Sequence, residues 1–353
     1  MDALWTFILN ERFWLAGNTT WKDFARLEKD ENIKLTNPND LIYVYPLAGI
    51  IYVIRVLFER YVAKPIGRSL GIQDRVGRNT TKDMKTTATT VSNRSKPINI
   101  NQTYQQEQVV SNDSGSSVST VRYSRITRLA KFSESCWRFT FYLSAFIYGV
   151  VILLNKSWTW DTRHCWLNYP NQPLTADIFW YYMIELAFYW SLLFSQFIDV
   201  KRKDFWQMFL HHIATIMLLS FSYIANYVRV GSLVLVIHDC ADYWLEGAKM
   251  AIYTRSKQIS DALFMIFAIV WFITRICYYP YKILYTTLFE GVSILESCPA
   301  AYYVFNGLLS LLYVLHYFWF YLICRIAITA LKSGQVKDER SDSEDSDGDD
   351  KNK

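Results

Sequence analysis

The sequence of 353 residues has six cysteines but no CxxC pair, which argues against a zinc site or a thioredoxin-type redox site. Its first 15 residues also lack the features of a cleavable signal peptide, because Asp2 and Glu11 stand where a basic segment belongs and no apolar core is present. Residues 71–130 contain no tryptophan and few large apolar side chains, and Ser, Thr, Asn and Gln dominate them. That composition predicts a disordered or weakly structured segment.

Apolar residues are abundant and lie in long blocks. Hydrophobic residues make up 52% of the chain and aromatic residues 17%, and short polar joints separate the blocks as in a multi-span membrane protein rather than a soluble core. We therefore predict an all-α polytopic membrane protein with about seven transmembrane helices. The fourth and fifth blocks are short and polar, so one of them could be re-entrant. The blocks cover residues 41–61, 137–154, 179–198, 205–223, 231–253, 259–279 and 302–330.

Basic residues gather in alternate joints, which predicts the orientation. Under the positive-inside rule, the joints after the first, third and fifth blocks face the cytosol. A lumenal segment 1–40, a polar cytosolic linker 62–130 and a cytosolic tail 333–353 follow. The residues concerned are Lys64, Arg68, Arg75, Arg78, Lys201, Arg202, Lys203, Arg255, Lys257, Arg325 and Lys332.

Ionisable residues interrupt the fourth and fifth blocks. His211 and His212 are adjacent in the fourth, and His238, Asp239 and Asp242 follow in the fifth. Such residues cost about 2.5–3.5 kcal/mol each in a membrane span on insertion scales and are usually functional. The clustering predicts a reaction centre inside the membrane.

The spacing suggests how the cluster works. Asp239, Asp242, Glu246 and Lys249 share one helical face, and it meets the His pair if the two helices pack antiparallel. A carboxylate beside an imidazole fixes its tautomer and raises its basicity, as general-base or nucleophilic acyl transfer requires. Adjacent histidines point about 100° apart on a helix, so they have different roles.

Two other interpretations compete. His211, His212, His238 and Asp242 are metal-ligand types, but adjacent histidines diverge and no HxxxH spacing is present, so we expect no metal. A single histidine such as His238 is often only a hydrogen-bonding group between membrane helices.

Residues 211–253 resemble the longevity-assurance (Lag) motif of ceramide synthases, in the wider TLC-domain family. The likeness rests on the His pair, Asn226, Arg229, the HDxxD element from His238 to Asp242, Glu246 and Lys249. It covers about residues 131–330, and we take residues 131–332 as a TLC catalytic membrane domain.

The resemblance implies a ceramide synthase that transfers a fatty acyl chain from acyl-CoA to the amine of a sphingoid base. It assigns catalysis to His211, His212, Asp239 and Asp242, with His238, Glu246, Lys249, Asn226 and Arg229 in support. It implies no cofactor, since acyl-CoA is a substrate, and a multi-pass location in the endoplasmic reticulum membrane.

Two routes stay open. In one, a histidine is the base while the amine attacks the thioester directly. In the other, which we prefer, His211 first forms an acyl-imidazole that the amine then cleaves. A hypothesis from another class is a non-catalytic, lipid-binding or translocon-associated TLC protein.

Several partners and modifications are also expected. Lys201, Arg202 and Lys203 either bind the CoA phosphates or only set the topology. Because members of the family associate, a homo- or heterodimer is expected. Residues 62–130 hold no intact homeobox-like domain, so we expect no nucleic acid to bind.

The joints and the tail carry the remaining candidates. Cys165 and Cys298 lie in predicted lumenal joints and either form a disulfide or stay unpaired. Asn18 is a glycosylation candidate. The acidic tail is either a phosphorylation target or only solubilising; its serines are Ser341, Ser343 and Ser346.

Overall fold

The apolar blocks of the sequence fold into long helices. The computed structural model describes residues 10–17, 19–30, 33–72, 127–199, 204–295 and 297–333, and every secondary-structure element among them is helical. The all-α prediction is therefore confirmed for the described part of the chain. Most of the predicted linker and nearly all of the acidic tail lie outside these residues.

Six helical segments are long and apolar enough to cross a membrane. The first joins η1 (Pro38–Tyr43), α4 (Val44–Phe58), η2 (Glu59–Ala63) and α5 (Lys64–Ser69). The next three are α6 (Arg128–Leu153), α8 (Ala176–Ile198) and α9 (Phe205–Ile224). The fifth joins α11 (Lys257–Trp271), η4 (Phe272–Leu284), η5 (Thr286–Glu290) and α12 (Gly291–Ile294). The last is α13 (Ala300–Ser333), whose apolar part ends at Ala330.

The remaining predicted span is α10 (Val228–Tyr253). Its 26 residues make a helix about 39 Å long, which is enough to cross a bilayer, and it is continuous rather than re-entrant. By composition it does not qualify as an apolar span, because it carries the ionisable residues of the predicted reaction centre. The expected seven spans therefore correspond to six apolar helices and one polar helix.

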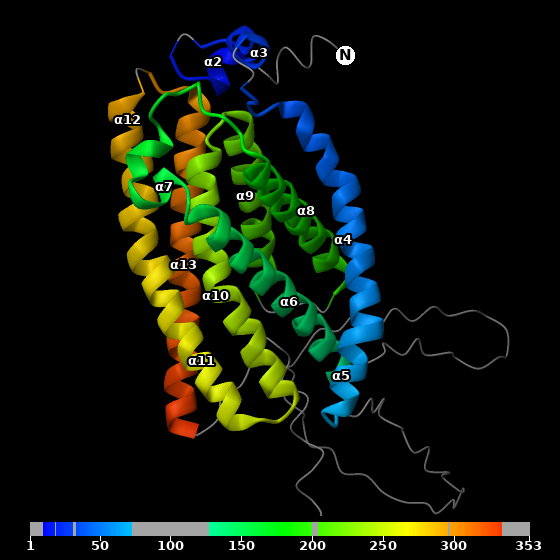
Figure 1. Ribbon diagram of the computed structural model, residues 1–353. Helices are drawn as coiled ribbons and strands as arrows, with labels where there is room; N and C mark the ends of the chain where they lie inside the picture. Colours follow the sequence, from blue (N-terminus) through cyan, green and yellow to red (C-terminus); the bar gives the residue numbers. More distant parts are fainter. Residues whose placement is uncertain are drawn as a thin grey trace, which may run out of the picture. The chain divides into compact units, whose positions relative to one another are not determined.

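The helices pack as a bundle around α8 and α10. Figure 1 shows α6 and α11 beside α10, and α4 and α9 beside α8. The apolar window of α8 is 78% buried within the bundle, whereas that of the first span is only 22% buried. Exposed α4 side chains such as Ile50, Val53 and Leu57 suit contact with lipid chains.

The two ends of the bundle are built differently. The short helices α2 (Glu11–Trp14) and α3 (Trp21–Asp30) lie at one end, and α5 lies at the other (Figure 1). These are called the α3 end and the α5 end below. At the α3 end, α7 (Ser157–Trp160) and η3 (Thr162–Cys165) lie in the joint between α6 and α8.

Two motif residues shape the turn from α9 into α10. Asn226 adopts a left-handed conformation with φ of 57°, which asparagine tolerates better than most residues. Gly231 lets Tyr182 pack against the first turns of α10, since a Cβ there would overlap the tyrosine hydroxyl. The turn is only three residues long, so α9 and α10 run antiparallel as predicted.

The segment after α11 has π-helical hydrogen bonding. It runs from Phe272 to Leu284 and contains Pro280, which has no N–H to donate to a helical bond. Such segments are rare and frequently occur at functional sites. Here it carries Arg275, which is 2% exposed and points into the bundle.

Candidate active site

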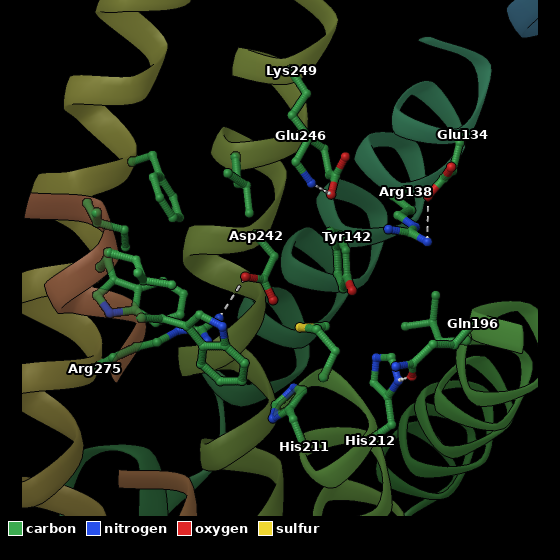
Figure 2. Close-up of a pocket in the computed structure, with 18 of the residues that line it drawn as sticks. Glu134, Arg138, Tyr142, Gln196, His211, His212, Asp242, Glu246, Lys249 and Arg275 are labelled. Carbon is green, nitrogen blue, oxygen red and sulfur yellow. Dashed lines mark hydrogen bonds and ion pairs between the residues drawn. The ribbon is translucent and has the colours of Figure 1, made fainter. Parts of the chain in front are cut away.

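A cavity of about 150 Å³ lies in the half of the bundle nearer the α5 end. Six helical segments line it: α6, α8, α9, α10, the α11–η4 segment and α13. Its polar lining (Figure 2) consists of Glu134, Arg138, Tyr142, Tyr189, Gln196, Asp199, His211, His212, Asp242, Glu246, Lys249 and Arg275. Its apolar lining includes Leu192, Phe264, Phe267, Leu322, Ile323 and Ile326. The cavity thus combines reactive groups with walls suited to hydrocarbon.

Both adjacent histidines reach this cavity from the first half of α9. The ring centroids of His211 and His212 are 5.7 Å apart, with ring planes at 47°. The two rings therefore face one space from different directions, as the helical geometry predicts. This arrangement allows one imidazole to react while the other exchanges a proton.

A glutamine holds His212. The Nδ1 atom of His212 lies 2.8 Å from Oε1 of Gln196, in the last turn of α8. The Gln196 Nε2 atom donates to the carbonyl oxygen of Phe205 at 2.7 Å. Since that carbonyl can only accept, the amide oxygen faces the imidazole, and Nδ1 carries the ring proton. The other ring nitrogen, Nε2, is then the basic one.

His211 is held by packing rather than by a hydrogen bond at Nδ1. Its ring meets the edge of Trp319 on α13, with centroids 5.3 Å apart, and Tyr189 lies 6.3 Å away. Its Nδ1 atom is buried and has no hydrogen-bond partner. The Nδ1 atom of His211 is therefore not engaged by a hydrogen bond, whereas that of His212 is.

Asp242 lines the cavity but forms an ion pair with an arginine, not with a histidine. Its Oδ1 accepts from Nη2 of Arg275 at 2.8 Å, and the same Nη2 donates to the carbonyl oxygen of His238 at 2.6 Å. The guanidinium lies over the ring of Trp271, 4.1 Å from its centroid. In the described part of the chain, no hydrogen bond joins Asp239 or Asp242 to either catalytic candidate on α9, so the predicted carboxylate–imidazole contact is not formed.

The other residues on this face of α10 lie partly at the cavity and partly in the interior of the bundle. Glu246 accepts from the Lys249 ammonium at 2.6 Å, and both line the cavity. Asp239 does not line it: its carboxylate accepts from the Tyr181 hydroxyl at 3.5 Å and lies beside Glu185 on α8. Asp239 shares the helical face, but it lies one turn farther from the α5 end, beyond the cavity. Asp239 therefore does not line this cavity, and its catalytic role stays a prediction.

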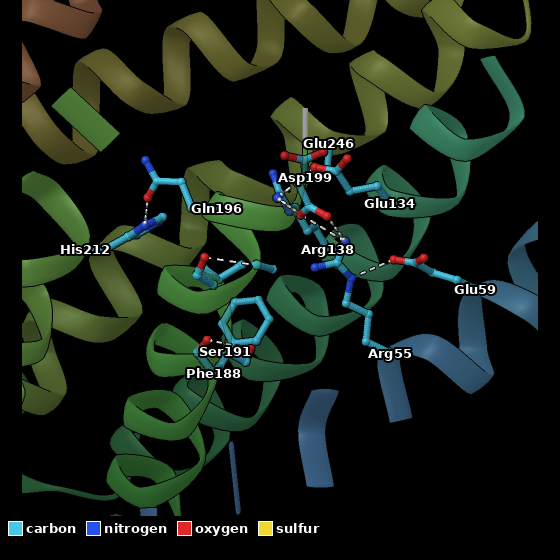
Figure 3. A network of polar contacts seen from close by, with 12 residues as sticks. Arg55, Glu59, Glu134, Arg138, Phe188, Ser191, Gln196, Asp199, His212 and Glu246 are labelled. Carbon is cyan, nitrogen blue, oxygen red and sulfur yellow. Dashed lines mark hydrogen bonds and ion pairs between the residues drawn. The ribbon is translucent and has the colours of Figure 1, made fainter. Parts of the chain in front are cut away.

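Charged residues from α4, α6 and the end of α8 surround the α5 side of the cavity (Figure 3). Asp199, at the end of α8, accepts from Nη2 of Arg55 on α4 at 3.0 Å, and Arg138 on α6 lies 3.5 Å from the same carboxylate. Arg55 also pairs with Glu59, and Arg138 with Glu134, both at 2.7 Å. Burial raises the pKa of Asp199 and Glu134 adds to this, while the two arginines oppose it. The first span thereby contributes to the boundary of the site.

A second imidazole pair lies deeper in the bundle. His238 and His316 are joined through their Nε2 atoms at 2.9 Å, and Nδ1 of His238 lies 2.7 Å from the Val234 carbonyl oxygen. His238 also lines an apolar cavity of about 30 Å³ between α9, α10 and α13. Its partner on α13 was not among the sequence-predicted residues. His238 thus serves as a helix-to-helix contact, which was the competing interpretation.

Asn226 and Arg229 lie away from the cavity, at the α3 end. The Asn226 amide donates to the carbonyl oxygens of Pro170 and Gln172 at 3.3 and 3.4 Å. Arg229 donates to the His164 carbonyl at 2.7 Å. These residues hold the joint between α6 and α8 against the α9–α10 turn, so any support they give to the site is structural.

Several predicted residues receive no test. Asn18, Lys201, Arg202, Lys203, Ser341, Ser343 and Ser346 lie outside the described residues. Cys165 and Cys298 are both free thiols in the structure, which is the unpaired alternative of the two that the sequence left open. Within the described ranges, no group of three or more His, Cys, Asp or Glu side chains has an arrangement that could hold a metal ion.

The residues that sequence reasoning missed are Gln196, Arg138, Arg275 and His316. Arg275 and His316 are ionisable groups inside apolar helices, which is a signal that the sequence does carry. Gln196 and Arg138 could not be singled out, because their roles depend on how neighbouring helices are rotated. The reactive positions on α9 and α10 were thus predictable, whereas most of their partners were not.

Comparison with known proteins finds relatives that match nearly the whole chain. The profile of the TLC domain matches residues 131–325. Ceramide synthase 5 from Homo sapiens is 42% identical over 355 residues, which cover 98% of this chain and 88% of that protein. Ceramide synthase 4 from Homo sapiens is 41% identical over 353 residues, covering 96% and 86%. Ceramide synthase 3 from the same organism is 38% identical over 355 residues, covering 97% and 89%.

Proposed function

The chain belongs to the ceramide synthases of the TLC-domain family, and we propose that it transfers a fatty acyl chain from acyl-CoA to the amine of a sphingoid base, with His211 and His212 as the reacting groups. The observation that carries the proposal is that both imidazoles line one cavity inside the helix bundle. A purely lipid-binding cavity needs neither ring, because burying polar groups among hydrocarbon is costly.

The two imidazoles are equipped for different steps. A ring nitrogen of His211 attacks the thioester carbonyl, the carbon–sulfur bond breaks, and the CoA sulfur leaves with the imidazole proton as a thiol. The neutral amine then attacks the acyl-imidazole carbonyl. His212 Nε2 accepts the amine proton and returns it to the departing His211 imidazole as the carbon–nitrogen bond breaks. The division of roles is supported by the Nδ1 of His211, which has no partner, and by the fixed His212 tautomer.

Arg275 is suited to stabilise the negative charge that develops on the carbonyl oxygen. Its Nη2 is held by Asp242 and the His238 carbonyl, and its Nε has no partner. A fixed cationic donor in a low-dielectric cavity acts most strongly on charge that appears only in the transition state. Asp242 then orients the arginine, so one of the two predicted acids acts on the reaction through Arg275.

The setting suits lipid substrates. Phe264, Phe267 and Ile323 offer apolar walls for a hydrocarbon chain. A thioester is already activated, so the transfer requires no cofactor. We place the protein in the endoplasmic reticulum membrane with the α5 end facing the cytosol. Binding of the CoA phosphates by Lys201, Arg202 and Lys203, which lie outside the described residues, stays a prediction.

The proposal is tested with microsomes that contain the full chain, sphinganine and acyl-CoAs of different lengths. The wild type is compared with His211→Ala, His212→Ala and the control His164→Ala, whose histidine lies in η3, away from the cavity. Wild type and control should form dihydroceramide, and the two cavity variants should not, at equal membrane insertion. Intact-mass analysis after acyl-CoA alone should show one added acyl group, absent in His211→Ala. Full activity in both cavity variants would sink the acyltransferase assignment of the pair and favour lipid binding.

A further inference from the structure

The last turn of α8 places a glutamine against the Nδ1 side of the His212 ring. Gln196 is two residues from the end of α8, and Phe205 is the first residue of α9. The amide therefore contacts two points on α9: the Phe205 carbonyl through Nε2 and the His212 ring through Oε1. Figure 2 shows the amide on the far side of His212 from His211.

From this contact we infer that Gln196 is a positioning residue for acyl transfer, which fixes His212 in the Nδ1–H tautomer and turns Nε2 toward the cavity as the proton acceptor. The inference rests on the proposed function for its catalytic part. It assigns to a neutral amide the position that sequence reasoning gave to a carboxylate. Asp239 and Asp242 are engaged elsewhere, with Tyr181 and Arg275 respectively.

The Phe205 carbonyl determines which end of the Gln196 amide faces the His212 ring. A free glutamine amide can present either its oxygen or its NH₂ group to a histidine, and the two ends select opposite tautomers. The carbonyl accepts hydrogen bonds only, so it binds the NH₂ end and leaves the oxygen for His212. The first backbone carbonyl of α9 thereby determines which nitrogen of a side chain two turns later is basic.

A neutral partner has a chemical consequence. A carboxylate beside the imidazole stabilises the imidazolium, whereas an amide oxygen orients the ring with little effect on its charge. His212 then stays neutral in the resting state and takes up a proton only while the amine attacks.

Two substitutions separate positioning from folding. Gln196→Met keeps the length but removes both hydrogen bonds. Gln196→Glu keeps an acceptor for the His212 Nδ1–H but loses the donor to the Phe205 carbonyl. Gln172→Met is the matched control, because Gln172 is also buried and its NH₂ group binds backbone carbonyls of the joint after α6.

We expect Gln196→Met to lower kcat by at least ~10-fold. The loss should not exceed the ~10²–10⁴-fold that a general base supplies in total, and KM for the sphingoid base should change little. Gln196→Glu should lose less kcat than Gln196→Met, because it keeps the acceptor for the Nδ1 proton although its charge favours the imidazolium. The control should keep wild-type kcat in the protein that folds. Wild-type kcat in Gln196→Met would overturn the inference. Equal losses of kcat in both Gln196 variants would also overturn it, because they would assign the effect to the lost contact with the Phe205 carbonyl.

A second measurement does not depend on activity. Nitrogen-15 NMR of histidine-labelled full-length protein, with the His212 signals assigned by difference against His212→Asn, reports which ring nitrogen is protonated. The wild type and Gln196→Glu should show the Nδ1–H form and Gln196→Met a mixture of tautomers. An Nε2–H form in the wild type would refute the inference. If His212→Ala is fully active but the tautomer follows Gln196, the proposed function fails and the positioning of the ring stands.

Discussion

His238 on α10 and His316 on α13 are joined nitrogen to nitrogen, with their Nε2 atoms 2.9 Å apart. Because the Val234 carbonyl accepts the Nδ1 proton of His238, Nε2 of His238 has a lone pair and His316 must be the donor. The bond therefore has a fixed direction and joins two helices that both line the cavity that holds His211 and His212.

Removal of the donor should loosen that contact. His316→Phe keeps a ring against Tyr279 but leaves the His238 Nε2 atom unpaired. We expect a loss of about 1–2 kcal/mol, the scale measured for hydrogen bonds between membrane helices, read as a lower thermal midpoint in detergent. The double variant with His238→Phe should lose less than the sum of the two single losses. Additive losses would show that the two rings do not interact.

The ion pair between Asp242 and Arg275 predicts an effect on rate. Arg275→Lys keeps the positive charge but cannot bind both Asp242 and the His238 carbonyl through one planar group. If the arginine stabilises the oxyanion, kcat should fall by about 10²–10³-fold, the cost of losing one such donor, with a smaller change in KM. A change confined to KM would instead place Arg275 in ground-state substrate binding.

The turn that carries Asn226 predicts a loss of stability without a loss of catalysis. Asn226→Gly tolerates the positive φ but lacks the amide that binds Pro170 and Gln172. Asn226→Ala also lacks the amide, and it tolerates the positive φ poorly. We expect Asn226→Ala to be the less stable by about 0.4–1 kcal/mol or more. Activity per folded molecule should match the wild type in both. A specific loss of kcat in Asn226→Gly would mean that this turn reaches the reaction centre.

The two thiols at the α3 end should be free. Burial raises the pKa of Cys165, so little of it is thiolate as the pH rises from about 7 to about 9, and maleimide should label it slowly throughout that range. Cys298 is less buried and should be labelled first. Mass tagging before and after reduction measures both rates. A pair that becomes labelled only after reduction would show that the two thiols form a disulfide in the membrane.

The fold and the reactive positions could be predicted because they depend on local features of the sequence. Apolar blocks determine the long helices, and His211, His212, Asp242, Glu246 and Lys249 reach one cavity because helical spacing and a three-residue turn bring them together. These relations span one helix or two consecutive helices.

The partners of these residues depend on information that a single sequence does not contain. Asp239 shares the helical face of Asp242 but lies one turn farther from the α5 end, beyond the cavity. Asn226 and Arg229 belong to the same motif as Asp242. Because a helix rises 1.5 Å per residue, however, Arg229 lies about 20 Å from Asp242 along α10. Gln196 meets His212 through the rotation of one helix against another. Rotation and relative depth are set by packing across the whole bundle.

The ion pair between Arg55 and Asp199 bears on how such proteins diversify. Arg55 precedes the stretch that matches the TLC profile, and Asp199 lies within it and lines the cavity. A chimera that receives residues 131–325 from a relative would therefore place that relative's counterpart of Asp199 against the first helix of this chain. The part of the chain that builds this site is wider than the stretch that the TLC profile matches, and exchanges of function between relatives should succeed more often when the first helix is carried along.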